Sequence, residues 1–317
     1  MFTLAHLSDP HLAGWSLDNP LALLGKRITG YLSWRLKRVK IHRADILDQL
    51  VADLARIKPD HIAVTGDLTN ISLPQEFAGA AAWLRTLGAA QDVSVIPGNH
   101  DAYVEQPFDQ SIGLWRQNMT GLMPGEAVSL SATEQPLMSV NDFPYVRQRG
   151  SIALIGASTA VPTKPFSAAG ELGEDQLARL AAILQQLGEI GLFRVLMIHH
   201  PPYVDRGGRR KSLRDHVALR QVLQQKGVEL VLHGHTHTEG LGRVATPTGE
   251  APVIGVASAS AVKYGHKDAA AYHLYRIGKV EGEWQVAMSV RSLDQTVGQF
   301  TEAGQMSLTI SASGMLA

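Results

Sequence analysis

Short apolar runs alternate along the chain with longer segments in which apolar residues recur at every third or fourth position. Runs of four or five mostly apolar residues are typical of buried strands, and the longer spacing is typical of amphipathic helices. The predicted strands are 4–7, 62–65, 93–96, 195–198 and 228–232, and the predicted helices are 43–57, 74–87, 174–187 and 212–225. This alternation of strand and helix indicates parallel strands in an α/β sheet.

The rest of the chain has a different pattern. Further predicted strands are 145–148 and 152–157, which form a hairpin, and 253–257, 271–277 and 284–291, which follow one another. Segment 103–140 is weakly patterned apart from a short helix near 109–118, and the polar tail after residue 295 predicts no element. Because no repeat, low-complexity tract or linker divides the chain, residues 1–317 are expected to form a single domain.

Polar residues of the metal-ligand type follow five of the strand-like runs. They are Asp9, His11, Asp67, Asn99, His100, Asp101, His199, His200, His235 and His237. Parallel strands project their carboxyl ends to one edge of a sheet, where ligands of α/β proteins bind. One such histidine alone would more commonly be a structural residue, but five strand ends with the same chemistry predict a shared site.

The composition narrows the chemistry of that site. The chain has no cysteine, which excludes disulfides, thiolate metal sites and a cysteine nucleophile. Carboxylates, imidazoles and one amide oxygen suit two borderline cations such as zinc, manganese or iron, whereas calcium prefers cages made only of oxygen. Lysine plus arginine equals aspartate plus glutamate, so no global field favours nucleic acid.

Five sequence blocks resemble those of the calcineurin-like metallophosphoesterases. In order they are Asp9-x-His11, Gly66-Asp67, Gly98-Asn99-His100-Asp101, His199-His200-Pro201-Pro202 and Gly234-His235-x-His237. The resemblance spans residues 9–237. Gly66-Asp67-Leu68-Thr69-Asn70 and the His-His-Pro-Pro block are most similar to the bacterial class III cyclic-nucleotide and glycerophosphodiester phosphodiesterases.

The resemblance implies an α/β fold of four layers, in which two central mixed β-sheets are flanked by α-helices. It also implies two divalent metal ions, of manganese, iron or zinc. The first would be held by Asp9, His11, Asp67 and His237, and the second by Asp67, Asn99, His199 and His235. Asp67 would bridge them, since only a carboxylate among these side chains binds two cations and offsets part of their repulsion.

The implied function is hydrolysis of a phosphodiester by metal-activated hydroxide. His100 would contact the phosphate and steady or protonate the leaving oxygen, and Asp101 would orient His100 through its other ring nitrogen. Alternatives are a phosphomonoesterase or a pyrophosphate hydrolase that acts on a nucleotide- or lipid-linked substrate. A catalytically silent scaffold would have lost ligands, and none is lost. The balanced charge argues against a nuclease that binds duplex nucleic acid.

Substrate contacts are expected from loops around the metals. His200 is a candidate because it lies beside a ligand, and Arg209 and Arg210 are candidates because their basic loop follows the His-His-Pro-Pro block. A solvated turn is an equal alternative for the two arginines. Segment 103–140 is the expected cap over the substrate.

Segment 21–43 is basic and amphipathic. Between Lys26 and Arg43 there are seven lysines and arginines and no acidic residue. The apolar residues of the segment include Leu21, Leu23, Leu24, Ile28, Tyr31, Leu32, Trp34 and Leu36. This composition is typical of a helix that lies at a membrane interface, which would suit a phospholipid-type substrate. The other interpretation is a surface helix that packs its apolar side on the domain, which leaves a small phosphodiester as the substrate.

The chain begins directly with a strand-like run and has no signal-peptide pattern and no apolar run of membrane-spanning length. We therefore expect a cytoplasmic protein, peripheral at the membrane if segment 21–43 binds lipid. An oligomer is compatible with the sequence.

Overall fold

The computed structural model describes residues 1–13, 17, 19–122, 134–204, 208–294 and 296–310. Two six-stranded mixed sheets form its centre. The first has the order β14 (Gln299–Ile310), β13 (Glu283–Asp294), β12 (Ala271–Val280), β1 (Phe2–Leu7), β2 (His61–Val64), β3 (Val93–Val95). The second has the order β10 (Gly240–Thr246), β11 (Gly249–Gly255), β9 (Leu230–His233), β8 (Phe193–Met197), β7 (Ile152–Gly156), β6 (Tyr145–Arg149).

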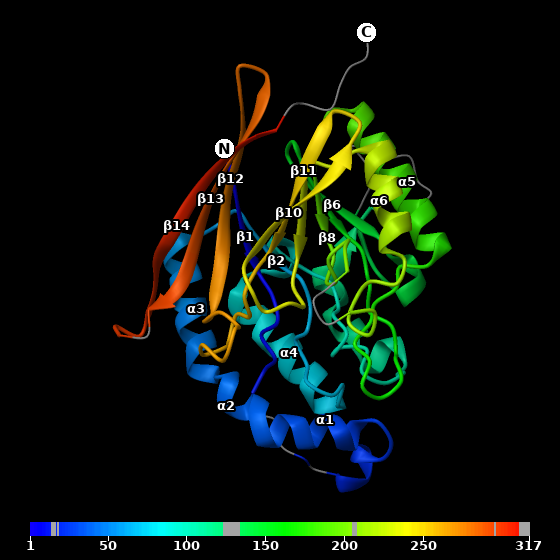
Figure 1. Cartoon of the computed structure of the whole chain (residues 1–317), viewed down its shortest axis with the longest axis vertical. Coiled ribbons are helices and arrows are strands. Elements are labelled where there is room, and N and C mark those ends of the chain that lie inside the picture. Colours follow the sequence, from blue (N-terminus) through cyan, green and yellow to red (C-terminus); the bar gives the residue numbers. More distant parts are fainter. Residues whose placement is uncertain (14–16, 18, 123–133, 205–207, 295, 311–317) are drawn as a thin grey trace.

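Helices cover the outer sides of both sheets. The long helices are α3 (Ala44–Ile57), α4 (Pro74–Leu87), α5 (Glu174–Glu189) and α6 (His216–Lys226). Figure 1 shows α3 beside the first sheet and α5 and α6 beside the second, with the sheets between them. Two buried apolar clusters fill the layers, one between the sheets and around α3 and α4, the other between the second sheet and α5 and α6. The predicted four-layer α/β sandwich is confirmed.

The predicted helices form where apolar residues recur on one face. Helix α3 buries Ile46, Leu50 and Leu54, which lie four residues apart. Helix α4 begins at Pro74 and ends before Gly88. Proline lacks an amide proton, but the amide at the first helical position has no partner within the helix, so no hydrogen bond is lost.

Helix α6 begins later than predicted. The pattern indicated a helix from Ser212, but the structure begins it at His216. Ser212 donates its hydroxyl to a loop carbonyl, and the Asp215 carboxylate accepts from the backbone amides of Leu172 (2.9 Å) and Gly173 (2.8 Å). The acidic residue therefore joins two loops and does not cap a helix from Ser212.

Strands β10 and β14 were not predicted. Each lies at a sheet edge and pairs with one neighbour only, β10 with β11 and β14 with β13. The side chains of 240–243 and 301–303 are mostly exposed. An edge strand with both faces near water has no apolar run or strict alternation, so its sequence resembles a loop.

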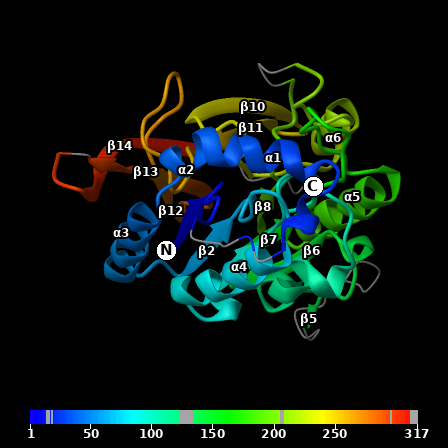
Figure 2. The same ribbon diagram turned by 90° about the horizontal axis from the view of Figure 1, so that it is seen from below.

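The parallel strands of the two sheets direct their carboxyl ends to one end of the molecule. In the first sheet β1, β2 and β3 are parallel, and in the second β7, β8, β9 and β11 are parallel. The basic segment lies at this end as η1 (Pro20–Leu23), α1 (Arg27–Ser33), the π-helical turn η2 (Trp34–Arg38) and α2 (Val39–Ile41). Figure 2, seen from that end, shows α1 and α2 crossing in front of the strands.

In the predicted cap, segment 103–140, Tyr103 stacks on His100 beside the ligand loops, whereas the part around Trp115 packs against the core. Trp115, in η5 (Ile112–Met119), is buried against Phe77 and donates to its carbonyl (3.1 Å). The Arg147 guanidinium holds the carbonyl of Thr120 and that of Val93, where β3 begins. This is the opposite end of β3 from Asn99, so these residues belong to the core and do not cover the site. Residues 123–133 lie outside the described part of the chain. The role of the segment as a cap stays a prediction.

A buried ion pair joins the second sheet to the loop before β9. Arg194, in β8, donates from Nε to one oxygen of Glu229 (2.9 Å) and from Nη2 to the other (2.6 Å), and both side chains are almost fully buried. We predict that Glu229→Ala lowers the free energy of unfolding by about 3–5 kcal/mol, because it leaves the Arg194 charge buried without its partner. Urea unfolding measures the change.

The exposed pair Arg214–Glu171 is the matched control, since both of its side chains are more than two-fifths exposed. Glu171→Ala should cost at most about 1 kcal/mol. Equal losses in the two variants would contradict the prediction.

None of the helices in the described ranges combines the length and the apolar character needed to cross a bilayer.

Candidate metal centre

The loops that follow the parallel strands are joined to one another through their backbones. In the first sheet the amide of Asp9 donates to the carbonyl of Gly66 (2.9 Å), and the amide of His11 donates to that of Asp67 (3.0 Å). In the second sheet the amide of Gly234 donates to the carbonyl of His199 (3.2 Å). The sheets meet where the amide of His235 donates to the Asp9 carboxylate (3.0 Å). The predicted strand-end residues are thus held in one place.

Backbone strain is concentrated at the same residues. Five of the predicted ligands have a positive φ: Asp9 (53°), His11 (39°), Asp67 (56°), His235 (66°) and His237 (54°). L-residues rarely adopt this region, and such strain persists where surrounding structure enforces it, which is characteristic of functional sites.

Glycine permits the close packing of these loops. A Cβ on Gly98 would lie 2.3 Å from Oδ1 of Asp67, and one on Gly234 would lie 2.5 Å from Oδ2 of Asp9. No side chain fits at either position, so the carboxylates can approach the neighbouring backbone only because these residues are glycines.

The first cluster contains Asp9, His11, Asp67 and His237, whose ligand atoms all lie within 4.8 Å of one another. Nε2 of His237 lies 3.1 Å from Oδ1 of Asp9 and 3.2 Å from Nε2 of His11. Nδ1 of His11 is 3.2 Å from the carbonyl of Thr69, which fixes the proton on Nδ1 and leaves Nε2 with a free lone pair. Four side chains thus direct donor atoms toward one point.

The second cluster contains Asp67, Asn99, His199 and His235. Oδ1 of Asn99 lies 3.2 Å from Nε2 of His199 and 2.9 Å from Nδ1 of His235. Oδ2 of Asp67 lies 3.4 Å from Nε2 of His199 and 3.7 Å from Nε2 of His11. One carboxylate oxygen therefore stands between the two clusters.

The electrostatics of these groups favour positive charge in the site. Burial lowers the pKa of His199, but the charge and hydrogen bond of Asp67 outweigh it and raise this pKa to about 9. The site therefore attracts positive charge even though it is buried. Burial lowers the pKa of His11 and of His235 well below the usual value, so both rings are neutral, as ligands must be.

An unpartnered buried atom supports the same conclusion. Among the described residues, Nε2 of His235 is buried and has no hydrogen-bond partner. Buried polar atoms normally have partners, and a divalent cation would supply one here. These residues fit the two divalent ions that the sequence implied.

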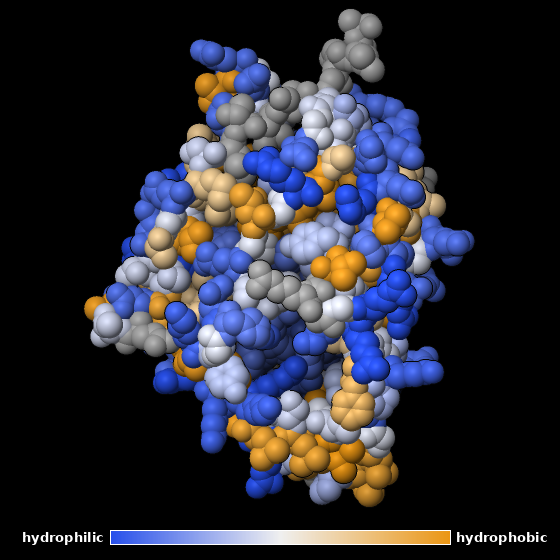
Figure 3. Space-filling model, in the orientation of Figure 1, coloured by the Kyte–Doolittle hydropathy of each residue, from blue (hydrophilic) through white to orange (hydrophobic). Residues whose placement is uncertain are grey.

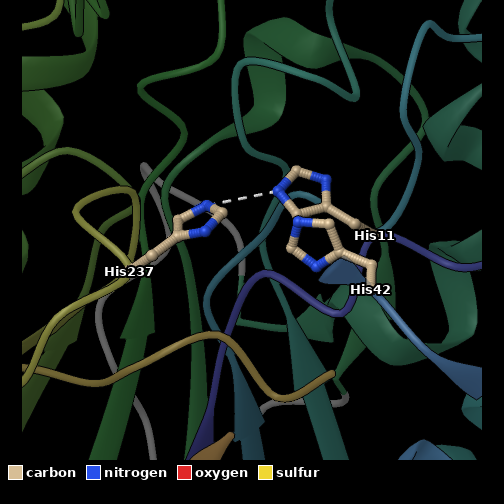
Figure 4. Close-up of side chains that lie close together, drawn as sticks. All are labelled: His11, His42 and His237. Atoms are coloured by element: carbon tan, nitrogen blue, oxygen red, sulfur yellow. Dashed lines mark hydrogen bonds between the residues drawn. The ribbon is translucent and has the colours of Figure 1, made fainter. Parts of the chain in front are cut away.

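Sequence reasoning missed a further imidazole at the first cluster. His42, the residue after α2, lies with its ring centroid 4.5 Å from that of His11 and 5.7 Å from that of His237 (Figure 4). Its Nδ1 lies 2.8 Å from the Ser260 hydroxyl. The ligand atoms of these three histidines are close enough to hold an ion. His42 follows a helix and belongs to no motif, so the sequence carried no signal for it.

His100 lies beside the clusters and contacts the basic segment. Nδ1 of His100 donates to the carbonyl of Asn70 (2.5 Å), so its Nε2 is the acceptor for Nη2 of Arg38 (2.8 Å). Tyr103 stacks on the ring at 5.7 Å between centroids. Burial, followed by the charge of Arg38, lowers the pKa of His100 to about 3. In the sequence Arg38 is one member of a basic segment, and the structure brings it to the site.

The role expected of Asp101 is wrong. Its carboxylate does not touch the His100 ring but accepts from the backbone amides of Gly98 (2.9 Å) and Thr69 (2.8 Å). The carbonyl of Asn70 orients the ring of His100 instead. Burial and the charge of Asp67 raise the pKa of Asp101 to about 7. Asp101 shapes the ligand loop.

His200 lies beside His199 and His235, with ligand atoms within 4.8 Å of one another, and its expected substrate contact stays a prediction. The side chain is fully buried, with Nδ1 2.8 Å from the hydroxyl of Thr159 and Nε2 3.0 Å from the carbonyl of Ala168. Both ring nitrogens are occupied within the protein. Arg209 and Arg210 are exposed, and their substrate role stays a prediction. Arg206, in the same basic loop, lies outside the described residues.

Comparison with known proteins agrees with this geometry. The family model for calcineurin-like phosphoesterase matches residues 2–239. Over 240 residues, or 74% of the chain, the sequence is 30% identical to a probable cyclic nucleotide phosphodiesterase from Rhodococcus erythropolis. Over 63% of the chain it is 26% identical to the glycerophosphodiester phosphodiesterase GpdQ from Enterobacter lignolyticus. These matches span 64% and 56% of the lengths of the two relatives.

The fold has a counterpart among solved structures. A dimetal phosphatase from Danio rerio superposes with a TM-score of 0.61 at 17% identity, covering 98% of this chain and 99% of that one. The match of the family model over three quarters of the chain, and the two clusters that its sequence blocks form, lead to one conclusion. This chain belongs to the calcineurin-like phosphoesterase family.

Proposed function

We propose that the protein is a dinuclear metal-dependent phosphodiesterase. The observation that carries the proposal is the position of Asp67, whose Oδ2 lies within 3.7 Å of an imidazole nitrogen in each cluster. Asp9, His11, Asp67 and His237 would hold one ion, and Asp67, Asn99, His199 and His235 the other. Divalent ions held there supply Lewis acidity toward phosphoryl oxygens and lower the pKa of water in the site.

Arg38 and His100 form the polar pair beside the ligands. The Arg38 guanidinium is partly buried and, among the described residues, forms no ion pair with a carboxylate. Burial lowers its pKa from the usual value, but an arginine remains charged. A phosphoryl oxygen would supply the missing negative charge, and the guanidinium geometry matches it.

The surrounding loop fixes this pair. The Thr69 and Ser72 hydroxyls both donate to the carbonyl of His100 (2.8 Å each). In this arrangement Nε2 of the neutral His100 accepts a hydrogen bond from Arg38 and so orients the guanidinium. We assign His100 the role of positioning Arg38 toward the phosphate.

A phosphodiester is the proposed substrate because both curated relatives are named as phosphodiesterases. Metal-loaded protein should turn over bis(4-nitrophenyl) phosphate with a higher kcat/KM than 4-nitrophenyl phosphate. The reverse preference would replace the diester by a monoester, and turnover of a pyrophosphate bond alone would indicate a pyrophosphate hydrolase.

Arg38 can be tested separately. We predict that Arg38→Ala lowers kcat/KM for the diester by about 10- to 100-fold, the scale for losing a hydrogen bond to a charged group, without loss of metal. Arg38→Lys should restore part of the activity. Arg35→Ala, an exposed arginine of the same helix turn, is the control and should behave as the wild type. Unchanged kinetics in Arg38→Ala would remove Arg38 from the site.

A further inference from the structure

The basic segment carries a continuous apolar stripe on its outer face. Its members are Leu21 (70% exposed), Leu24 (75%), Ile28 (51%), Leu32 (51%), Leu36 (69%) and Val39 (41%). Ile28, Leu32, Leu36 and Val39 are three or four residues apart, which places them on one side of α1, η2 and α2, and Leu21 and Leu24 lie just before α1. Figure 3 shows the stripe as an apolar band along the end of the molecule where α1 lies. The stripe therefore does not pack on the domain, whereas Leu23, Tyr31 and Trp34 of the same segment are half-buried.

The opposite face of the segment is held by the domain and contains polar groups beside the half-buried Leu23, Tyr31 and Trp34. Arg27 donates to the carbonyls of Ile71 (3.2 Å) and Ser72 (2.6 Å), and Arg38 donates to His100. A Cβ on Gly30 would lie 2.5 Å from Cγ2 of Ile71, so glycine is required for the close approach. These contacts fix the rotation of the helix. A surface helix in water normally buries its apolar side chains, and here a stripe of aliphatic side chains is left exposed.

The charges beside the stripe indicate what covers it. Arg35, Lys37 and Lys40 are exposed and, among the described residues, form no ion pair, and no acidic residue lies between Lys26 and Arg43. The whole chain carries no net charge, so this end is a local positive patch. An anionic lipid surface has apolar acyl chains beneath negatively charged headgroups. An apolar stripe with cationic flanks complements such a surface.

The loop beside α1 extends the apolar surface. Lys26, which precedes α1, donates to the Thr163 hydroxyl (3.0 Å), and Thr163 donates to the carbonyl of Ser167 (2.6 Å). Phe166 lies between Thr163 and Ser167 in the sequence, and its side chain is 81% exposed.

We propose that α1, η2 and α2 form an interfacial helix that docks on anionic lipid and brings the metal centre to a lipid-linked phosphodiester. The link to the centre is Arg38, which belongs to the docked helix and contacts His100. The site would thus lie about one helix diameter, ~10 Å, from the lipid. The lipid surface follows from the stripe alone, and the substrate class rests on the proposed function.

Binding is tested without substrate, by sedimentation with vesicles. Wild-type protein should sediment with vesicles of phosphatidylglycerol and phosphatidylcholine in equal parts, and not with phosphatidylcholine alone. High salt should weaken binding, because the Debye length falls from ~10 Å at 0.1 M to ~3 Å at 1 M. Recovery of the wild type in the supernatant with both vesicle types would overturn the inference.

Two variants separate the apolar and charge contributions. Replacing Leu24, Ile28, Leu32 and Leu36 together by glutamine should lower the partition coefficient at least ~100-fold. Replacing Arg35, Lys37 and Lys40 by glutamine should remove the preference for anionic vesicles. The control replaces four exposed apolar residues elsewhere, Ile190, Val217, Leu241 and Val280, by glutamine and should leave binding unchanged. A stripe variant that binds as the wild type would overturn the inference.

The substrate class is tested with two diesters. The stripe variant should match the wild type on soluble bis(4-nitrophenyl) phosphate and lose turnover of a long-chain 4-nitrophenyl phosphodiester embedded in anionic vesicles. Equal turnover of the embedded diester would overturn the substrate assignment. Vesicle binding with no diester turned over would support the docking surface and reject the proposed function. The wild type could instead be a dimer that does not bind vesicles and that the stripe variant converts to a monomer. That result would assign the stripe to a second copy of the chain and overturn the lipid assignment.

Discussion

Replacement of Asp67 by alanine should remove bound metal from both positions and abolish nearly all turnover. Its Oδ2 is the one carboxylate oxygen of the described centre that lies near imidazoles of both clusters, and its Oδ1 accepts from the amide of His100 (2.7 Å). Loss of the carboxylate leaves the two ions with no shared negative ligand. Metal analysis of the purified variant, with turnover measured on the same sample, checks this result.

Asp45→Ala is the matched control, because that carboxylate is exposed and pairs only with the exposed Arg43 among the described residues. It should retain the metal content and rate of the wild type. Circular dichroism of Asp67→Ala shows whether the fold survives. Full metal occupancy with a near-normal rate in a folded Asp67→Ala variant would contradict the assignment of Asp67.

Replacement of His100 by alanine is expected to keep both metal positions filled while turnover falls by about 10- to 100-fold, as in Arg38→Ala, because His100 acts through Arg38. His100 lies beside the clusters, and its ring nitrogens contact Asn70 and Arg38. The measurements are metal content and kcat. His266→Ala, at an exposed histidine, is the control. Loss of metal from His100→Ala would mean that His100 is a ligand.

A double variant tests how His100 acts. If it works by positioning Arg38, then His100→Ala combined with Arg38→Ala should lose little more activity than His100→Ala alone, because both changes remove the same contact. Independent roles would give multiplied losses. Additive free energies in this cycle would contradict the positioning role.

The core of the fold and the ligand candidates could be predicted from the sequence, because buried strands and their carboxyl ends leave a recognisable pattern. Buried parallel strands leave short apolar runs, and their carboxyl ends meet, so Asp9, Asp67 and His199 could be placed together before their contacts were known. The helix 74–87 was predicted with its observed ends because proline and glycine mark them. The edge strands β10 and β14 have no such pattern, because both of their faces approach water.

The contacts around the ligands could not be predicted in the same way. Arg38 and His42 reach the centre from a helix that carries no motif, and only tertiary packing brings them there. Asp101 and His200 are adjacent to ligands in sequence, but backbone direction turns them toward amides and carbonyls of the protein. Adjacency in sequence therefore identified the loops correctly and, for Asp101, the role of the side chain incorrectly.

The orientation of the basic segment was likewise open. Its composition is compatible with an apolar side that faces the domain or one that faces outward. In the structure Arg27, Gly30 and Arg38 face loop 69–73 and His100, and this contact leaves the aliphatic stripe outside. Such a choice depends on which neighbours the helix meets, and one periodic pattern cannot specify them.

The central claim is a shared two-metal centre that hydrolyses phosphodiesters, and a titration tests it most directly. Metal-free protein, prepared with a chelator, would receive increasing amounts of manganese(II), with bound metal per chain and turnover of bis(4-nitrophenyl) phosphate measured in each sample. We predict no turnover in the metal-free protein and a rise that reaches its plateau at two bound ions per chain. Undiminished turnover without metal, or a plateau at one bound ion, would contradict the account.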